Sequence, residues 1–186
     1  SDIYQVLKMG ETFGNAAYIT KCRVEGLRDL GPAISPMNSG LILQGIEALS
    51  LRMDRECDSS MKLARWFETH PMVESVCYPG LESHPTHENA KKYLRNGFGG
   101  VLSVVVKGTR KGASDFVKTL KLVSHVSNVG DTRTLIVQPA ATTHSQLDAG
   151  ALKAAGIEET MLRISVGLEH LDDLKADFEQ AFAAMK

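Results

Sequence analysis

The stretch "MLRISVGLEH", residues 161–170, decides how the C-terminal part of this chain folds. Apolar side chains occupy every second position from Leu162 to Val166, which is the two-residue period of a strand with one buried face. Arg163 lies between them and therefore belongs to the opposite face. A mid-strand arginine usually meets solvent or pairs with a carboxylate, so the strand alone does not give Arg163 a function.

The residues around this strand alternate between strand and helix patterns. Apolar positions in the closing segment recur at helical spacing, so that segment has one face for a sheet. The sequence predicts an α/β fold with a mixed or mainly antiparallel sheet and helices packed on one face. The predicted strands cover 73–79, 99–108, 122–126, 134–139 and 161–167, and the predicted helices 88–94, 112–120 and 171–185, with a loop or short helix at 143–155.

The first 70 residues are predicted to be helical. One helix runs from about Asn15 to Leu30 and ends at Gly31, a residue that tolerates the left-handed conformation of a helix end. Ser35 and Pro36 then open a second helix, predicted to continue to about Thr69. At 1.5 Å per residue it would be roughly 50 Å long, so we expect it to bridge two bodies and to pack on a partner domain or subunit.

Composition excludes several classes of protein. Lys+Arg 21 against Asp+Glu 22 gives a net charge of -1, which provides no basic field for nucleic acid. The longest apolar runs are far shorter than the roughly 20 residues of a membrane span, and no signal peptide is visible, so no membrane is expected and the cytoplasm is the expected location. Cys22, Cys57 and Cys77 form no CxxC pair and are expected to be reduced thiols.

Histidines offer little evidence for a metal site. His84 and His87 have a ligand-like spacing, but Pro85 lies between them and no further cluster of ligands completes a tetrahedral set. The segment is therefore interpreted as a loop that caps a helix, and no metal is expected. No flanking signal supports a nucleophilic Cys–His pair either.

The densest polar stretch is "VSNVGDTRTLIVQPAATTHSQL", residues 126–147. It contains one turn near Asn128 to Asp131, a strand, and a second turn from Pro139 to His144. Both turns could lie at neighbouring ends of the sheet. Asn, Gly, Asp and Thr are also common in turns for conformational reasons alone, so a purely structural role stays open.

Two of these stretches, "SNVGDTRTLIVQPAATTHSQL" and "LRISVGLEHLDDLKADFEQAF", closely resemble the C-terminal portion of a known enzyme family. This family is the group of pyridoxal-phosphate enzymes of cysteine and methionine metabolism. It contains the cystathionine synthases and lyases, methionine gamma-lyase and the homoserine sulfhydrylases. The resemblance extends back through "ETFGNAAYITKCRVEGLRDLGPAISPMNSGLILQGIEALSLRM". The "TFGNAA", Asn-Val-Gly-Asp and Thr-Thr-His-Ser-Gln-Leu runs look most like the O-acetylhomoserine sulfhydrylases.

The resemblance implies roles for three residues. The arginine of the family's "LR-S-VG-E" strand forks onto the α-carboxylate of the substrate, and that position is Arg163 here. A planar guanidinium suits this role because it grips a carboxylate through two bonds and keeps its charge. Asn128 matches a position that contacts the same carboxylate, largely through its main chain, and Thr143 matches a position that lines the substrate pocket.

The resemblance also implies that much of the enzyme lies elsewhere. The family's cofactor lysine, its phosphate-binding residues and its ring-stacking residues belong to an N-terminal large domain, so we expect no catalytic, cofactor-binding or metal-binding residue in this chain and expect it to be inactive alone. Residues 1–35 would end the large-domain region, 36–70 would form the inter-domain helix, and 71–186 would be the C-terminal α/β domain.

The expected activity of the parent enzyme is gamma-replacement with pyridoxal phosphate, in which O-acetylhomoserine and sulfide give homocysteine and acetate. Methionine gamma-lyase, cystathionine gamma-synthase and O-succinylhomoserine sulfhydrylase are alternatives within the family. The expected partners are the large domain and further copies of the chain in a homo-oligomer. An alternative of another class is a non-catalytic α/β module that binds small molecules.

Overall fold

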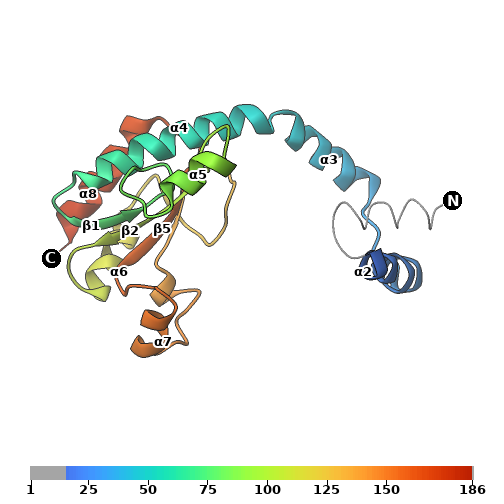
Figure 1. Ribbon diagram of the computed structural model, residues 1–186. Coiled ribbons are helices and arrows are strands. Elements are labelled where there is room, and N and C mark those ends of the chain that lie inside the picture. Colours follow the sequence, from blue (N-terminus) through green and yellow to red (C-terminus); the bar gives the residue numbers. More distant parts are fainter. Residues whose placement is uncertain (1–15, 186) are drawn as a thin grey trace. The chain divides into compact units, whose positions relative to one another are not determined.

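Residues 16–185 are described in a computed structural model of the chain (Figure 1). The chain divides into two compact units, residues 1–47 and 48–186. Asn15 and the residues of "TFGNAA" before it, on which part of the resemblance rests, lie outside the described residues.

The described part of the first unit, residues 16–47, is mainly helical, as predicted. α2 (Ala16–Lys21) continues into η1 (Cys22–Leu30), a wider π-helical segment. Gly31 ends it with a φ of 73°, and its N–H donates to the carbonyls of Gly26 and Leu27 at 3.2 and 3.1 Å. The predicted helix end at Gly31 is therefore confirmed. α3 (Pro36–Glu47) follows, and Asn38 N–H donates to the Ser35 hydroxyl at 3.1 Å at its beginning.

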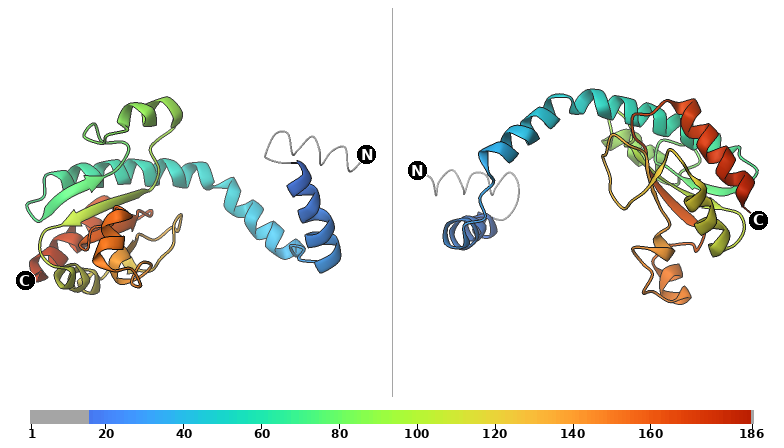
Figure 2. Two further views of the ribbon diagram at one scale, coloured as in Figure 1. Left: turned by 60° about the horizontal axis from the view of Figure 1, so that its bottom comes forward. Right: turned by 180° about the vertical axis from the view of Figure 1, so that it is seen from behind.

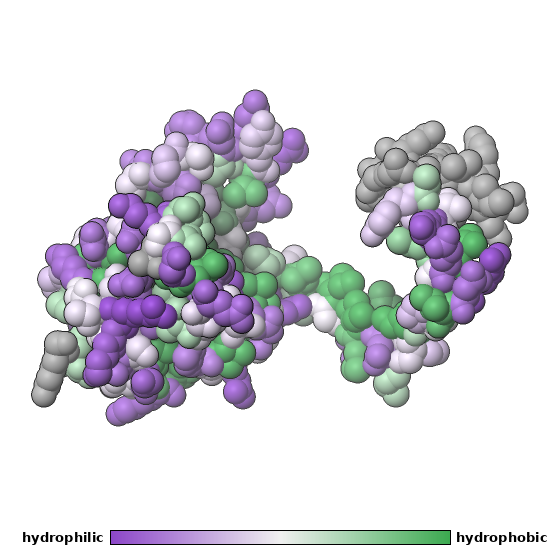
Figure 3. All heavy atoms as spheres, turned by 90° about the horizontal axis from the view of Figure 1, so that it is seen from below, coloured by the Kyte–Doolittle hydropathy of each residue, from purple (hydrophilic) through white to green (hydrophobic). Residues whose placement is uncertain are grey.

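The single helix predicted over 36–69 is wrong in its continuity, because α3 ends at Glu47 and α4 (Leu49–Glu68) begins after Ala48. Ala48 has φ −96° and ψ 3°, outside the helical range. Packing explains the difference between the two helices, since tertiary contacts supply most helical stability. α4 buries Leu63, Ala64 and Phe67, whereas α3 buries no residue and exposes a row of large apolar side chains (Figure 3).

The second unit contains a five-stranded sheet with the order β1-β2-β5-β4-β3. β1–β2, β2–β5 and β4–β5 pair antiparallel, and β3–β4 pair parallel. The predicted α/β fold with a mixed, mainly antiparallel sheet is confirmed. The strands are β1 (Val73–Cys77), β2 (Val101–Val106), β3 (Ser124–His125), β4 (Leu135–Val137) and β5 (Met161–Ser165).

Helices cover one face of this sheet (Figures 1 and 2). Phe67 of α4, Phe116 of α6 and Phe178 of α8 form an aromatic cluster, with ring centroids 5.1 Å apart for Phe67–Phe178 and 6.2 Å for Phe116–Phe178. Leu162 and Ile164 belong to the same core, each only 1% exposed. The helices of this unit after α4 are α5 (His87–Tyr93), α6 (Arg110–Thr119), α7 (Ala149–Ala154) and α8 (Leu171–Ala184), with the short η2 (Pro139–Ala141).

A buried carboxylate ties α8 to the segment before β3. Asp177 is 6% exposed and accepts the backbone N–H groups of Lys121, Leu122 and Val123 at 2.9, 2.9 and 3.0 Å. Buried donors need partners, and this one side chain satisfies three of them. Asp177 therefore fixes the point from which the chain runs through β3 into the polar turn at 127–131.

Within the part of the chain that the structure describes, no helix is both long enough and apolar enough to span a membrane.

Candidate substrate-binding site

Arg163 lies in the middle of β5 on the face opposite the core, as the alternation predicts. Its strand neighbours are Ser103 of β2 and Val137 of β4. The side chain is partly buried, and its Nη2 lies 3.5 Å from the hydroxyl of Ser127. Between residues 16 and 185 no carboxylate lies within ion-pair distance of this guanidinium. The charge is therefore available to an anionic ligand.

The turn at 127–131 lies against β5 beside Arg163. Ser165, two residues further along the same strand face, is 3% exposed, and its hydroxyl accepts the N–H of Gly130 at 3.3 Å. Gly130 has a φ of 75°, which favours glycine. Asp131 accepts the N–H of Arg133 at 3.0 Å and closes the turn. The structure thus brings the turn that carries Asn128, an exposed residue, next to the strand that carries Arg163.

The end of β5 is locked to the beginning of β4. Glu169 accepts both the N–H and the hydroxyl of Thr134 at 2.7 Å, and the Thr134 oxygen in turn accepts the N–H of Gly167 at 2.9 Å. A Cβ on Gly167 would lie 2.5 Å from backbone atoms of Thr132 and Arg133, so only glycine fits there. Gly167 and Glu169 of the "VGLEH" stretch therefore hold the two strands on which the site is built.

Thr143 follows η2, a short element that contacts β5. It is exposed, and its hydroxyl lies 2.9 Å from His144 Nδ1. Gln138, just before η2, is buried and donates to the carbonyls of Arg110 and Glu159 at 3.0 and 2.9 Å. The 138–144 segment is thereby anchored to α6 and to the residues before β5. No described contact joins Thr143 with Arg163 or Asn128.

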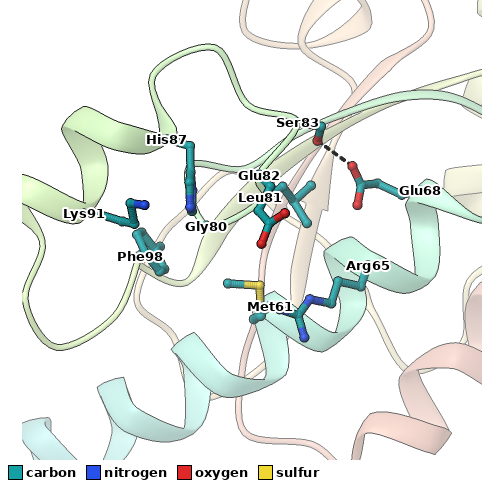
Figure 4. A pocket seen from close by; sticks show the side chains of 10 residues that line it. All are labelled: Met61, Arg65, Glu68, Gly80, Leu81, Glu82, Ser83, His87, Lys91 and Phe98. Carbon is teal, nitrogen blue, oxygen red and sulfur yellow. Dashed lines mark hydrogen bonds between the residues drawn. The ribbon is translucent and has the colours of Figure 1, made fainter.

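A cavity of about 590 Å³ lies elsewhere in the second unit, between α4 and the segment from Gly80 to Phe98 (Figure 4). Arg65, Glu68 and Glu82 line it together with apolar side chains, and Ser83 donates to Glu68 at 2.5 Å. None of the three predicted site residues lines this cavity. The lining of this cavity mixes basic and acidic side chains and shows no convergence of groups on one ligand.

The described residues around Arg163 do not form a pyridoxal-phosphate site. That cofactor needs a lysine amine for its Schiff base and a cradle for its phosphate. The described hydrogen bonds of this site come from Ser127, Ser165 and Asp131, and no lysine amine takes part in them. The arrangement can hold and orient an anionic group.

Comparisons with known proteins identify the family. Residues 6–183 match the model of the Cys/Met metabolism PLP-dependent enzymes. The chain belongs to this family. It is 50% identical over 98% of its length to a sulfhydrylase of Fusarium oxysporum f. sp. lycopersici, and 47% identical over 97% of its length to O-acetyl-L-homoserine sulfhydrylase 1 of Thermus thermophilus. These matches cover 42% and 43% of the two relatives, so the chain spans about two-fifths of their length.

A solved structure leads to the same family. The putative O-acetylhomoserine (thiol)-lyase of Campylobacter jejuni superposes with a TM-score of 0.83 and 38% identity, over 90% of this chain and 40% of that one. That crystal structure contains a pyridoxyl-lysine phosphate residue. The cofactor of this Cys/Met family is therefore pyridoxal phosphate, as the sequence resemblance implied.

Sequence reasoning missed the residues that hold the site together. Asp177, Ser165 and Glu169 were not proposed, because each acts through a contact with a residue at least 35 positions away. A signal was present for Glu169, since an acidic residue a few positions after a buried strand is available to backbone donors of the neighbouring strand. Asp177 had no such signal, since it lies in a helix among charged residues.

Proposed function

We propose that the chain supplies the substrate-carboxylate grip of a pyridoxal-phosphate-dependent O-acetylhomoserine sulfhydrylase. The observation that carries this proposal is Arg163, a partly buried guanidinium in mid-strand with no carboxylate in ion-pair distance among residues 16–185. The family membership and the similarity to O-acetylhomoserine enzymes support the choice of reaction.

In this proposal Arg163 binds the α-carboxylate of the amino-acid substrate through two parallel N–H···O bonds. Asn128 adds a contact from the turn at 127–131, and Thr143 lines the pocket. The rigid sheet is a suitable base for this grip because a substrate held in one orientation presents its reacting carbon consistently. The overall reaction would replace the acetoxy group of O-acetylhomoserine by sulfide, which releases acetate and forms homocysteine.

The bond-breaking steps would depend on groups outside residues 1–186. The lysine that carries the cofactor and the residues that hold its phosphate would belong to another part of the protein, so this chain alone would be inactive. The assignment of residues 1–35 to the end of that part, 36–70 to an inter-domain helix and 71–186 to the C-terminal domain stays a prediction.

We also infer that the apolar surface of α3 is covered in the whole protein. Met37, Leu41 and Ile46 are 72%, 59% and 56% exposed in the chain alone. Exposed apolar surface of this extent marks a contact with a partner. Both the large domain and a second copy in a homo-oligomer would provide one.

The experiment that tests the reaction assays the full-length enzyme with sulfide and either O-acetylhomoserine or O-succinylhomoserine. We expect the acetyl ester to be the better substrate, with homocysteine and acetate formed in equal amounts. A preference for the succinyl ester would overturn the choice of substrate. Tight calorimetric binding of an amino acid by the 186-residue chain alone would favour the non-catalytic binding module.

A further inference from the structure

A cysteine and a histidine meet at the end of β1, in a part of the molecule that the proposed function does not use. Cys77 Sγ lies 3.4 Å from His84 Nε2, within hydrogen-bond distance for sulfur. Cys77 is the last residue of β1, where it pairs with Ser103 of β2, and its side chain is exposed. His84 lies in the turn that follows and is partly buried.

The contacts of the other ring nitrogen decide which way the hydrogen bond runs. His84 Nδ1 lies 3.3 Å from the backbone N of Thr86 and 3.2 Å from the Thr86 hydroxyl. A backbone N–H can only donate, so Nδ1 is the acceptor and the proton of the neutral ring lies on Nε2. Nε2–H therefore donates to Cys77 Sγ. The sulfur that would attack a disulfide thus has a fixed N–H donor beside it.

The turn holds His84 in this position. Its N–H donates to the carbonyl of Leu81 at 3.1 Å, and its carbonyl accepts the N–H of His87 at 3.0 Å. Ser83 is bound to Glu68 of α4 at 2.5 Å (Figure 4). A cavity of about 390 Å³ is lined by His84, His87 and Lys91 together with the carboxylates of Glu82 and Glu88. Cys77 does not line this cavity, so a small molecule would reach the thiol from its own exposed side.

We propose that the Cys77–His84 pair is a site of thiol–disulfide exchange with a small disulfide such as oxidised glutathione. The Cys77 thiolate attacks one sulfur of the disulfide and a new S–S bond forms. The old S–S bond breaks, its electron pair leaves on the other sulfur, and that thiolate takes a proton from water. Cys77 is thereby oxidised to a mixed disulfide and one glutathione is reduced.

The two other cysteines provide internal comparisons. Cys22 is exposed on η1 but no hydrogen bond to its sulfur is described in this chain. Cys57 is partly buried, and its Sγ lies 2.7 Å from the place where a Cβ of Gly97 would be, so the thiol is closely packed. Cys22 is thus an exposed cysteine without a histidine partner among the described residues, and Cys57 is a cysteine whose thiol is closely packed.

The test incubates the 186-residue chain, in which Cys22 and Cys77 are both exposed, with oxidised glutathione near neutral pH and follows each cysteine by peptide mass spectrometry. A single hydrogen-bond donor at the attacking sulfur stabilises the negative charge that this atom carries during the exchange. We therefore expect Cys77 to react about three- to tenfold faster than Cys22. His84→Phe, which keeps a ring but removes the donor, should slow Cys77 by the same factor. His125→Phe, at an exposed histidine of β3, should leave the rate of Cys77 unchanged.

A Cys22 that reacts as fast as Cys77 would overturn the proposal, and so would an unchanged Cys77 rate in His84→Phe. If His84→Phe loosens the fold, Cys57 becomes reactive as well. In that case the comparison of Cys77 with Cys22 in the unmodified protein decides alone. None of these outcomes depends on the sulfhydrylase activity, so the two proposals can fail separately.

Discussion

Replacing Gly167 by alanine should strongly destabilise the second unit, because the backbone of residues 132–134 occupies the space of the new side chain. The methyl carbon would lie 2.5 Å from Thr132 O and Arg133 C and 2.6 Å from Thr134 N. Ordinary contact begins near 3.4 Å, so the two segments must separate by about 0.9 Å. That shift would stretch the bonds from Gly167 N–H to Thr134 and from Thr134 to Glu169, now 2.9 and 2.7 Å, past hydrogen-bond length.

The cost combines two terms. Overpacking a tight site costs about 1–3 kcal/mol, and losing a hydrogen bond to a carboxylate costs about 1.5–3 kcal/mol, so we expect a loss of about 2.5–6 kcal/mol in the free energy of unfolding. Urea unfolding followed by the fluorescence of Trp66, the single tryptophan of the 186 residues, measures this change.

Gly112→Ala is the matched control, because Gly112 lies in α6 and a Cβ there would meet only ordinary contacts at 3.5 and 3.8 Å. In a helix that change should be neutral or stabilising by up to about 1 kcal/mol. A Gly167→Ala protein within 1 kcal/mol of the unmodified protein, with Gly112→Ala behaving as expected, would refute the reasoning about the backbone contact.

Three further changes test other parts of the account. Asp177→Ala removes the acceptor of three backbone N–H groups and should cost about 3 kcal/mol or more in urea unfolding; a change below 1 kcal/mol would contradict the anchoring role. Burial raises the pKa of Glu56, so its contribution to stability is present at acidic pH and is lost as pH rises through that raised pKa. In thermal melts, Glu56→Gln should therefore gain stability relative to the unmodified protein as the pH rises from mildly acidic to neutral. A stability difference between the two proteins that stays constant over this pH range would contradict the prediction. Ser165→Ala removes one neutral hydrogen bond, worth about 0.5–1.5 kcal/mol, and should accelerate amide exchange at Gly130 more than at Val166.

The order of strands and helices in the second unit could be predicted from the sequence because its periodicities are strong. Leu162 and Ile164 mark a strand with one buried face, and the apolar residues of α8 mark a helix on that face, so the packing of the two follows. The position of Arg163 on the other face follows from the same alternation, whereas its contact with Ser127 does not. Connection lengths did not fix how the strands pair, because the long connections allow crossovers as well as hairpins, and the short connection from β3 to β4 joins the parallel pair.

Other features depend on contacts that local patterns do not encode. The break at Ala48 was not predictable, because the residues around it have helical spacing and only the difference in burial between α3 and α4 separates them. The role of Gly167 could not be inferred either, since the chain that excludes its side chain is 33 to 35 residues away in sequence. The Cys77–His84 pair depends on a turn that reverses the chain over seven residues.

The central claim is that Arg163 binds the substrate and does not hold the fold together, and Arg163→Lys in the full-length enzyme tests it most directly. Lysine keeps the charge but loses the two-bond fork, so kcat/KM for O-acetylhomoserine should fall about 10- to 150-fold, equivalent to about 1.5–3 kcal/mol. The KM for sulfide, the cofactor absorbance and the free energy of unfolding should stay unchanged, the last within about 0.5 kcal/mol. Arg133→Lys, at an exposed arginine of the neighbouring turn, is the control and should keep full activity. An Arg163→Lys enzyme that unfolds at lower urea yet retains its kcat/KM would contradict the account and make Arg163 a structural residue.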